Sequence, residues 1–313
     1  MAYIVSVGVN AFDDSSWDLN YAVADAQLTA KSVSERLRKS GQFADVVTVE
    51  LLSTKKQRSL GDATATKDYV RQVLGALAGR PVDQRLIRLV PGAAKLKEAF
   101  PEDLVLISFS THGYNGTNGR FHLFPSDIGD GDLKKIDDWG ISTDDLMLWL
   151  RDVDAGEMVM IVDACQSAGT VEQEGFKPGP MGSRGLGQLA YNKRMRILTA
   201  SESDRPAYER EGLGHGLLTY ALVQNGLIEK GAAIDGQITL GGWLKYAEQR
   251  VPKLFGKVRK GEVPNAKGET IRQVRPIGGD DEKAERSFQK PSLFDFTRGR
   301  TKDVVLVDKA GVK

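Results

Sequence analysis

Short apolar runs rich in β-branched residues recur along the chain, and each has the length of a strand buried in a sheet. The five clearest runs are Tyr3–Val9, Val46–Leu52, Leu104–Phe109, Val159–Val162 and Arg196–Thr199. A sixth run, Val304–Val307, is predicted to close an edge of the same sheet.

Helical patterns separate these runs. In Tyr21–Leu37 and Thr66–Leu77, apolar residues recur every three or four positions, as on one face of a helix. Gly216–Leu227 and Leu240–Val251 predict two more helices after the fifth run. Strands that alternate with helices favour right-handed crossovers and parallel pairing. The pattern therefore predicts an α/β fold, with a mostly parallel central sheet of about six strands flanked by helices.

Three segments lack a regular pattern. Thr170–Lys193 is rich in glycine and proline and is predicted to be a flexible loop. Gly79–Pro101 reads as an insertion with a short helix around Ala93–Ala99, and Gly256–Glu285 as a long loop. A chain of 313 residues with this pattern is expected to form one main domain.

Composition argues against two classes of partner. With 43 Lys and Arg against 42 Asp and Glu, the chain has no strong field to attract nucleic acid or an anionic membrane. No apolar stretch approaches the roughly 18 residues of a membrane-spanning helix. The one cysteine cannot form an internal disulfide, so we expect a reducing, cytoplasmic location.

That cysteine, Cys165, follows an apolar run directly, and His112 follows another. Loops at the carboxyl ends of parallel strands gather side chains into sites. If the two strands are neighbours, the imidazole can accept the thiol proton and later protonate a leaving amine. The N–H groups of Gly113 and Cys165 are candidates for an oxyanion hole. Alternatively, Cys165 is a small core residue and His112 a turn histidine.

The surrounding motifs resemble those of the caspase-like cysteine peptidases, in particular the metacaspase and bacterial orthocaspase branch. The motifs are Val-Gly-Val-Asn at 7–10, Ala-Asp-Ala at 24–26, Ser-Thr-His-Gly at 110–113, Asp-Ala-Cys-Gln-Ser at 163–167, Gly-Leu-Leu-Thr-Tyr-Ala-Leu at 216–222 and Gln-Lys-Pro at 289–291. Thr111 replaces the glycine usual before the catalytic histidine. The resemblance implies a caspase-hemoglobinase fold across 1–313, with a large-subunit-like part (1–169), the loop 170–193 and a small-subunit-like part (194–313).

The predicted substrate specificity depends on Asp163, which lies two residues before Cys165. A buried carboxylate in the pocket for the residue before the scissile bond favours arginine or lysine and repels aspartate. The resemblance adds Asp25 and Ser110 to this pocket. The alternatives are that Asp25 faces or caps a helix and that Ser110 is a buried hydroxyl bonded to backbone.

No cofactor is expected for the chemistry, but the resemblance implies calcium as a bound ion. Asp127, Asp144, Asp145 and Glu172 fall at positions comparable with its ligands, and carboxylate oxygens suit a hard cation. Alternatively, Ser-Thr-Asp-Asp-Leu at 142–146 is simply a helix start. The remaining histidines, His122 in an alternating segment and His215 before a helix, are expected to be structural.

These residues predict a cysteine endopeptidase that cleaves proteins or peptides after arginine or lysine, and the resemblance implies that it acts as a monomer. Activation by an activating protease, a regulatory protein or self-cleavage would fall in the loop 170–193. Its candidate basic sites are Lys177, Arg184, Lys193 and Arg194. By analogy with the branch, the role would lie in bacterial stress, cell death or defence. Two alternatives stay open: a catalytically idle adaptor, and a peptidase with a different preference, such as acidic residues, which Asp163 opposes.

Overall fold

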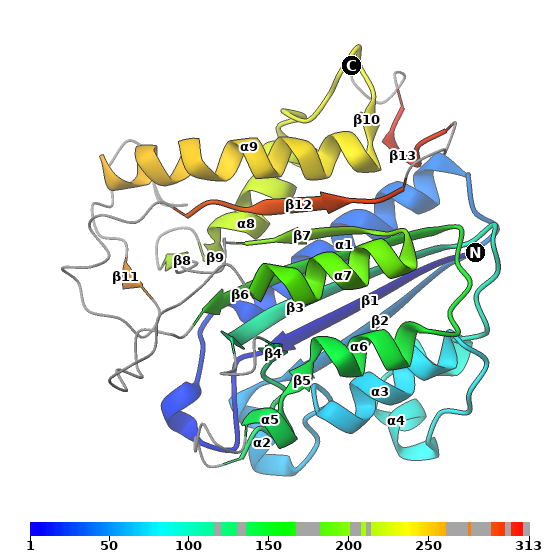
Figure 1. Cartoon of the computed structure of the whole chain (residues 1–313), viewed down its shortest axis with the longest axis vertical. Helices are drawn as coiled ribbons and strands as arrows, with labels where there is room; N and C mark the ends of the chain where they lie inside the picture. Colours follow the sequence, from blue (N-terminus) through cyan, green and yellow to red (C-terminus); the bar gives the residue numbers. More distant parts are fainter. Residues whose placement is uncertain are drawn as a thin grey trace.

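The computed structural model describes residues 1–115, 120–129, 136–166, 182–200, 208–210, 214–260, 275–276, 289–297 and 302–308. For some residues inside these segments, Cys165 among them, only the backbone is described. This part of the chain has three layers, with a central sheet between two sets of helices (Figure 1).

Six strands follow one another across the central sheet in the order β12, β7, β6, β3, β1, β2. Their bounds are Ser292–Asp295 (β12), Arg196–Thr199 (β7), Glu157–Gln166 (β6), Leu104–Asn115 (β3), Ala2–Val9 (β1) and Val46–Ser53 (β2). All neighbouring pairs are parallel except β12 with β7. The short strands β4 (Phe121–Leu123) and β5 (Ile141–Ser142) add an antiparallel extension beside the end of β3.

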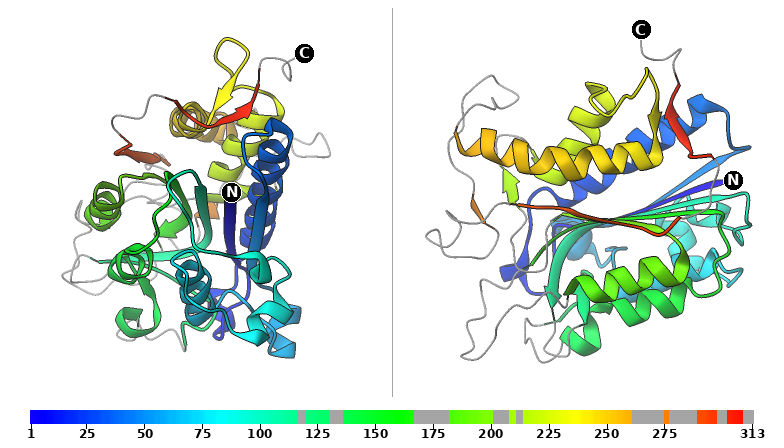
Figure 2. Two further views of the ribbon diagram at one scale, coloured as in Figure 1. Left: turned by 90° about the vertical axis from the view of Figure 1, so that its right-hand side faces the viewer. Right: turned by 45° about the horizontal axis from the view of Figure 1, so that its top comes forward.

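Helices cover both faces of the sheet, as the two views in Figure 2 show. One face carries α1 (Ala22–Ser40), α8 (Leu217–Thr219), a π-helix (Tyr220–Ile228) and α9 (Leu240–Arg259). The other carries α3 (Lys67–Ala76), α6 (Thr143–Leu150) and α7 (Gly182–Lys193). None of the helices in the described part of the chain is long and apolar enough to cross a membrane.

The remaining elements are short. They are η1 (Ser15–Trp17), α2 (Lys55–Leu60), α4 (Gln84–Leu89), η2 (Ala93–Lys95), α5 (Ile136–Trp139), β8 (Tyr208–Arg210), β9 (His215–Gly216), β10 (Ile238–Thr239), β11 (Arg275–Pro276) and β13 (Val305–Val307).

The predicted α/β fold and its five main strands are confirmed, and β7 has the predicted bounds. Strands β3 and β6 continue beyond the apolar runs because they pair with each other over ten consecutive positions, up to Gly113 and Gln166, and β3 continues to Asn115 through its pairing with β4. His112 and Cys165 therefore lie within the last paired positions of the two strands rather than after the strands end. The predicted helix at 216–227 is present as α8 followed by the π-helix.

The prediction that 170–193 is a loop is wrong for residues 182–193, which form α7. Its buried residues Leu186, Leu189 and Ala190 recur at helical spacing. A Cβ at Gly185 would lie 2.6 Å from the Thr143 hydroxyl oxygen, so the glycine that suggested a loop instead permits close packing on α6. Residues 170–181 lie outside the described part of the chain.

The prediction that the strand at 304–307 lies at the edge of the central sheet is also wrong, although the strand itself is present. Segment 304–307 contributes β13, which pairs with β10 in a separate two-stranded sheet, and β12 forms the edge of the central sheet instead. Within the predicted loop at 256–285, α9 continues to Arg259 and residues 275–276 form β11; the rest lies outside the described residues. The helix expected around 93–99 is the short η2, preceded by α4.

A buried arginine ties the edge of the sheet together. Arg196 on β7 contacts Glu157 on β6 (2.8 Å), Asp295 on β12 (3.1 Å) and Asp303 (3.1 Å). Asp303 also accepts a hydrogen bond from the Gly241 N–H at the start of α9. This cluster therefore connects residues 1–169 to the later part of the chain. Breaking a buried ion pair typically costs about 3–5 kcal/mol, so the connection contributes to the stability of the fold.

Candidate active site

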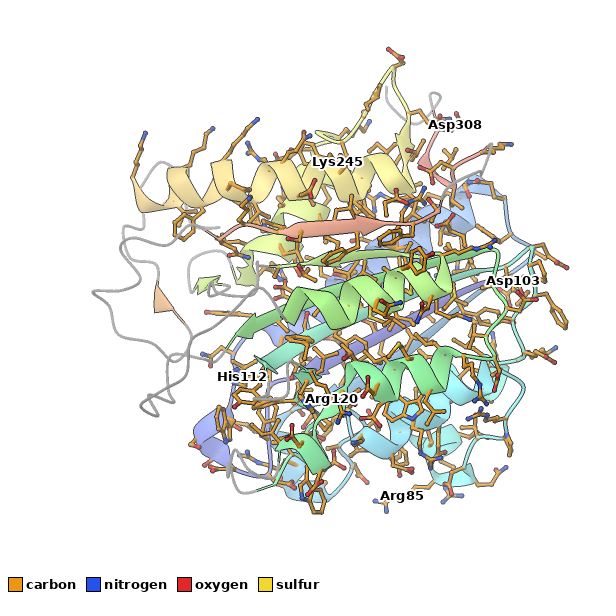
Figure 3. All side chains as sticks on the ribbon, viewed as in Figure 1. Arg85, Asp103, His112, Arg120, Lys245 and Asp308 are labelled. Carbon is orange, nitrogen blue, oxygen red and sulfur yellow. The ribbon has the colours of Figure 1, made fainter. Side chains whose placement is uncertain are left out.

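The candidate nucleophile and base lie on neighbouring strands. The β3–β6 register places His112 opposite Cys165 and Ser110 opposite Asp163. Neighbouring strands lie about 4.8 Å apart, so the two backbones are adjacent at the carboxyl edge of the sheet. The condition on which the approach of the two residues depends, that their strands are neighbours, is therefore met. Figure 3 shows His112 and Asp103 at opposite ends of β3, with His112 at this edge.

His112 is enclosed by aromatic rings and is only 4% exposed. Phe12, Trp17 and Phe124 surround it, with ring centroids 5.3, 5.7 and 5.9 Å away. Burial lowers the pKa of His112 to about 4, although the hydrogen bond with the Trp17 carbonyl acts in the opposite direction. The imidazole is therefore neutral at pH 7.

The Trp17 carbonyl also selects the tautomer. His112 Nε2 lies 2.8 Å from this oxygen. A carbonyl only accepts hydrogen bonds, so the proton must reside on Nε2. That leaves Nδ1 as the basic nitrogen, which is the form that a general base requires.

A polar contact holds the loop that carries Trp17. Asp18 accepts a hydrogen bond from the Phe12 N–H (3.1 Å), and Arg58 donates to the same carboxylate at 2.8 Å. Sequence reasoning missed all of these residues. The available signal was an aromatic residue in an acidic loop that follows β1, whose carboxyl end lies at the same edge of the sheet.

Two residues next to His112 have clear structural reasons for their identity. Thr111 donates its hydroxyl proton to the Phe124 carbonyl (2.6 Å), so the threonine that departs from the family pattern fixes the β3–β4 connection. At Gly113, a Cβ would lie 2.7 Å from the Phe121 ring and 3.2 Å from Ala164 Cβ. Glycine is thus required for packing, whether or not its N–H stabilises an oxyanion.

Two acidic side chains come together on the face covered by α1 and α8, and below the term acidic pocket means Asp25, Asp163 and the segment 215–219 that contacts them. Asp25 on α1 accepts a hydrogen bond from the Gly216 N–H (3.0 Å), and its other oxygen lies 2.7 Å from His215 Nδ1. Asp163 accepts hydrogen bonds from the Thr219 hydroxyl (2.9 Å) and N–H (3.3 Å). The structure therefore links Asp25 and Asp163 to the same short segment, 215–219.

The two carboxylates border a common point. A Cβ on Gly216 would lie 3.0 Å from an Asp163 oxygen and 3.1 Å from an Asp25 oxygen. Burial raises the pKa of Asp25, while the hydrogen bonds from His215 and Gly216 oppose this change. The capping alternative for Asp25 is wrong, because its side chain contacts 215–216 and α1 has no side-chain cap. Ser110 is buried at the register position beside Asp163.

The proposed calcium ligands have other partners. Asp127 accepts a hydrogen bond from the Lys67 N–H (2.9 Å), Asp144 pairs with Arg120 (2.8 Å), and Asp145 forms a capping box with Ser142. Burial raises the pKa of Asp145, but the Ser142 hydrogen bonds and the Lys67 charge outweigh it and lower the pKa. Glu172 lies outside the described residues.

Lys67 already supplies a cation in this region. Its Nζ contacts the carbonyls of Gly140 (2.7 Å) and Asp138 (3.1 Å) and an Asp145 oxygen (3.3 Å). Across the described segments, no group of three His, Cys, Asp or Glu residues is arranged to hold a metal ion. The described acids therefore fit calcium poorly. His122 lies in β4 as expected, with Nε2 3.1 Å from Asp137.

The candidate processing sites lie in different surroundings from those predicted. Arg184 is in the first turn of α7, and Lys193 is its last residue, donating to the carbonyls of Arg151 and Val153. Arg194 connects α7 to β7 with φ 49°. Lys177 lies outside the described part of the chain. Cleavage needs a locally unfolded segment, so the contacts of Lys193 and the hydrogen bond from the Arg194 N–H to the Tyr191 carbonyl (3.2 Å) oppose cleavage after either residue.

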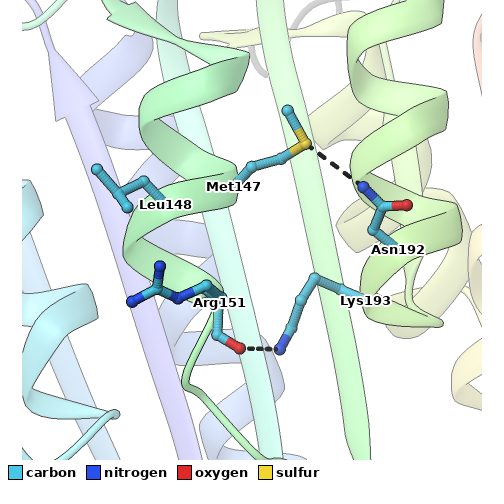
Figure 4. A pocket seen from close by; sticks show the side chains of 5 residues that line it. All are labelled: Met147, Leu148, Arg151, Asn192 and Lys193. Carbon is cyan, nitrogen blue, oxygen red and sulfur yellow. Dashed lines mark hydrogen bonds between the residues drawn. The ribbon is translucent and has the colours of Figure 1, made fainter.

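A cleft of about 410 Å³ lies between α6 and α7, and Figure 4 shows the side chains that line it. Its lining residues are Met147, Leu148, Arg151, Asn192 and Lys193. The cleft lies where α7 ends and β7 begins, at the amino edge of the parallel strands. His112 lies at the opposite edge, so this cleft belongs to a different region of the molecule.

The family model of the caspase domain matches residues 1–273, which include the β3–β6 pair and the acidic pocket. The chain belongs to the caspase domain family. None of the curated proteins matches it. The caspase domain together with the mostly parallel sheet and flanking helices gives the α/β caspase-hemoglobinase fold. Membership indicates cysteine peptidase activity and protein substrates. In this caspase domain, sequence reasoning named Asp25 and Asp163 as candidates but did not predict the contacts that His215 and Thr219 make with them.

Proposed function

We propose that this caspase domain is a cysteine endopeptidase of the metacaspase and bacterial orthocaspase branch that cleaves after arginine or lysine. The observation that carries the proposal is the pair of carboxylates, Asp25 and Asp163, beside the strand ends that hold His112 and Cys165. A guanidinium or ammonium group satisfies such carboxylates, whereas a substrate aspartate would be repelled.

In the proposed mechanism, His112 Nδ1 accepts the Cys165 thiol proton, and the thiolate attacks the scissile carbonyl carbon. The carbonyl electron pair moves to oxygen, where the N–H groups of Gly113 and Cys165 stabilise the negative charge. Collapse of this intermediate breaks the C–N bond, and His112 protonates the leaving amine. Water, deprotonated by His112, then hydrolyses the acyl-enzyme and regenerates the thiol.

The Trp17 carbonyl supports this proton transfer. Its contact with Nε2 keeps the ring in one tautomer and stabilises the imidazolium that forms transiently. The aromatic surroundings keep water away from the ring and favour its neutral form between transfers.

Two other functions are the alternatives. An idle adaptor would not need a buried histidine held in one tautomer, and the His112–Trp17 contact favours catalysis. A preference for acidic residues would need a cationic pocket, but the described groups at this position include the carboxylates of Asp25 and Asp163.

The rest of the proposal draws on the composition and on the resemblance. It includes a monomer in the cytoplasm and a role in bacterial stress, cell death or defence, without nucleic acid or membrane as a partner. For activation by self-cleavage, an activating protease or a regulatory protein, we favour Lys177 over Lys193 and Arg194. The chemistry uses no cofactor, and the contacts of Asp144 and Asp145 disfavour a calcium requirement.

The direct test is release of a fluorophore from peptides that end in arginine, lysine, aspartate or leucine. Wild type is expected to cleave the first two, and Cys165→Ala and His112→Ala to lose on the order of 10⁴-fold or more in kcat/KM. Since the chain has one cysteine, alkylation by iodoacetamide reports on Cys165 alone. Full activity of Cys165→Ala would disprove the mechanism, and cleavage after aspartate would disprove the specificity.

Intact-mass measurement of wild type and Cys165→Ala tests processing. Fragments that end at Lys177 in wild type only would support self-cleavage. The same unbroken mass in active wild type and in the variant would show that activity needs no cut.

A further inference from the structure

The proposed mechanism gives no role to His215, yet this residue lies in the acidic pocket. Its Nδ1 is 2.7 Å from one oxygen of Asp25, and the other oxygen accepts the Gly216 N–H at 3.0 Å. Both oxygens of the Asp25 carboxylate are thus engaged by the segment 215–216. A substrate cation that binds Asp25 must share or take over one of these contacts.

Space around Asp25 favours replacement over sharing. The Asp25 side chain is only 4% exposed, so there is little room for a second donor beside the imidazole. A guanidinium binds a carboxylate best through two parallel N–H···O contacts, which require free access to both oxygens. The ring of His215 stands at the oxygen that such a contact would use.

The second carboxylate of the pocket is held differently. Asp163 is contacted by the hydroxyl and N–H of Thr219, which carry no charge at any accessible pH. Among the partners described for the two carboxylates, the imidazole of His215 is a side-chain nitrogen, as the substrate's guanidinium or ammonium donors are, and it contacts Asp25. His215 therefore provides the pocket with a donor that resembles the proposed substrate group.

His215 also lies where it can move. Its side chain is 26% exposed, against 4% for Asp25, so the ring stands between the buried carboxylate and solvent. The preceding Gly214 has φ +68° with no atom near its Cβ position, and Gly216 follows. The ring can leave Asp25 toward solvent without crossing the packed core.

We propose that His215 is a specificity-determining residue: its imidazole occupies Asp25 in the free enzyme and is displaced by the arginine or lysine side chain of the substrate. This inference rests on the proposed function. A cationic side chain replaces the contact that is lost, whereas a neutral or acidic one leaves the buried carboxylate without a partner. Displacement lowers the apparent affinity for cationic substrates, since only molecules with the ring withdrawn can bind.

Variants of His215 separate displacement from a positioning role. With arginine peptides, His215→Ala is expected to lower KM several-fold with kcat nearly unchanged, because no group has to leave. His215→Gln, which keeps a neutral donor, should lie between Ala and wild type. His215→Lys should raise KM at least tenfold, because its tethered ammonium competes for Asp25. A raised KM in both Ala and Gln, at normal thermal stability and Cys165 alkylation rate, would overturn the proposal.

A second measurement does not depend on catalysis. The chain has three histidines, so their imidazole signals can be assigned in histidine-labelled Cys165→Ala protein by comparison with His215→Gln. Agmatine, which carries a guanidinium without the rest of a peptide, is expected to shift the His215 signals on binding. Binding of agmatine with unchanged His215 signals would overturn displacement.

The two arms also distinguish this inference from the proposed function. If agmatine does not bind while Cys165 still cleaves leucine or aspartate peptides, the peptidase stands, but both its basic specificity and the role of His215 fail. If no peptide is cleaved, yet agmatine displaces His215, the inference about the pocket holds and the catalytic proposal fails.

Discussion

His112 and His215 lie at the same edge of the sheet, but their surroundings differ. His112 packs against three aromatic rings and contacts a backbone carbonyl, while His215 is partly exposed and contacts a buried carboxylate. Burial among rings disfavours a positive charge on His112, whereas His215 directly contacts an acidic group. The comparison teaches that one edge of a sheet can hold an imidazole that stays neutral beside a pair of carboxylates, which is the arrangement that the proposed function uses.

Among the variants that separate the two sides without removing Cys165 or His112, the largest effect is expected on the pocket side. Asp163→Asn should raise KM for arginine and lysine peptides by about a hundredfold, because loss of one partner from a buried charge pair costs roughly 2–5 kcal/mol. The alkylation rate of Cys165 should stay within about twofold of wild type, since the catalytic side is unchanged. Steady-state kinetics with arginine, lysine and leucine peptides measure this, and a uniform loss of kcat would contradict the division into two sides.

The next effect concerns the catalytic side. His112 must be neutral to accept a proton, so kcat/KM should fall as the pH drops through about 4, the pKa of His112. Trp17→Ala keeps the carbonyl but lets water reach the imidazole ring. The pKa of His112, and with it the pH at which kcat/KM falls, should therefore move toward the ordinary histidine pKa of about 6.5. At pH 5 the variant should lose more than tenfold in activity.

A matched control is Trp139→Ala, which removes a tryptophan that is 51% exposed on α5. This variant should keep the wild-type pH profile. An acid limb near pH 6.5 in wild type would show that the aromatic surroundings do not control the charge of His112.

A smaller effect is expected at Thr219. Thr219→Val removes the hydroxyl that donates to Asp163 but keeps the shape and the N–H contact. The loss of one hydrogen bond to a charged group should raise KM for arginine peptides about five- to tenfold. Peptide kinetics that show no change would mean that Thr219 does not orient Asp163 for the substrate.

The smallest effect is expected from calcium. Asp144 and Asp145 already have Arg120, Ser142 and Lys67 as partners, so about 1 mM calcium or a chelator should change kcat/KM less than twofold. A tenfold calcium activation, measured with the same arginine peptide, would contradict this reading of the acids and would make Glu172→Gln the next variant to study.

The sequence was sufficient for the strands and for the approach of His112 to Cys165, because buried apolar runs identify strands and neighbouring parallel strands end at one edge. It also named Asp163 from its place before Cys165 and Asp25 through the family resemblance, and both contact the segment 215–219, while their role in specificity stays a prediction. Local patterns misled at 182–193, where glycines signalled a loop while packing against Thr143 required small residues in a helix.

The contacts that define the pocket could not be predicted from local patterns. Asp25 and His215 are 190 positions apart, and their approach depends on how the segment 215–219 crosses the end of the sheet. Likewise, Trp17 and His112 are 95 positions apart, and the contact uses a backbone carbonyl that carries no sequence signal. Only tertiary structure shows such pairs.

The cluster around Arg196 bears on what a cut between β6 and α7 would produce. Its contacts cross from β6 to β7, β12 and the start of α9, and β7 itself is hydrogen-bonded to β6. Two polypeptides produced by such a cut would separate on a denaturing gel but migrate together in gel filtration. A molecule of this caspase domain that has been cut once in this segment would therefore remain folded as a single particle.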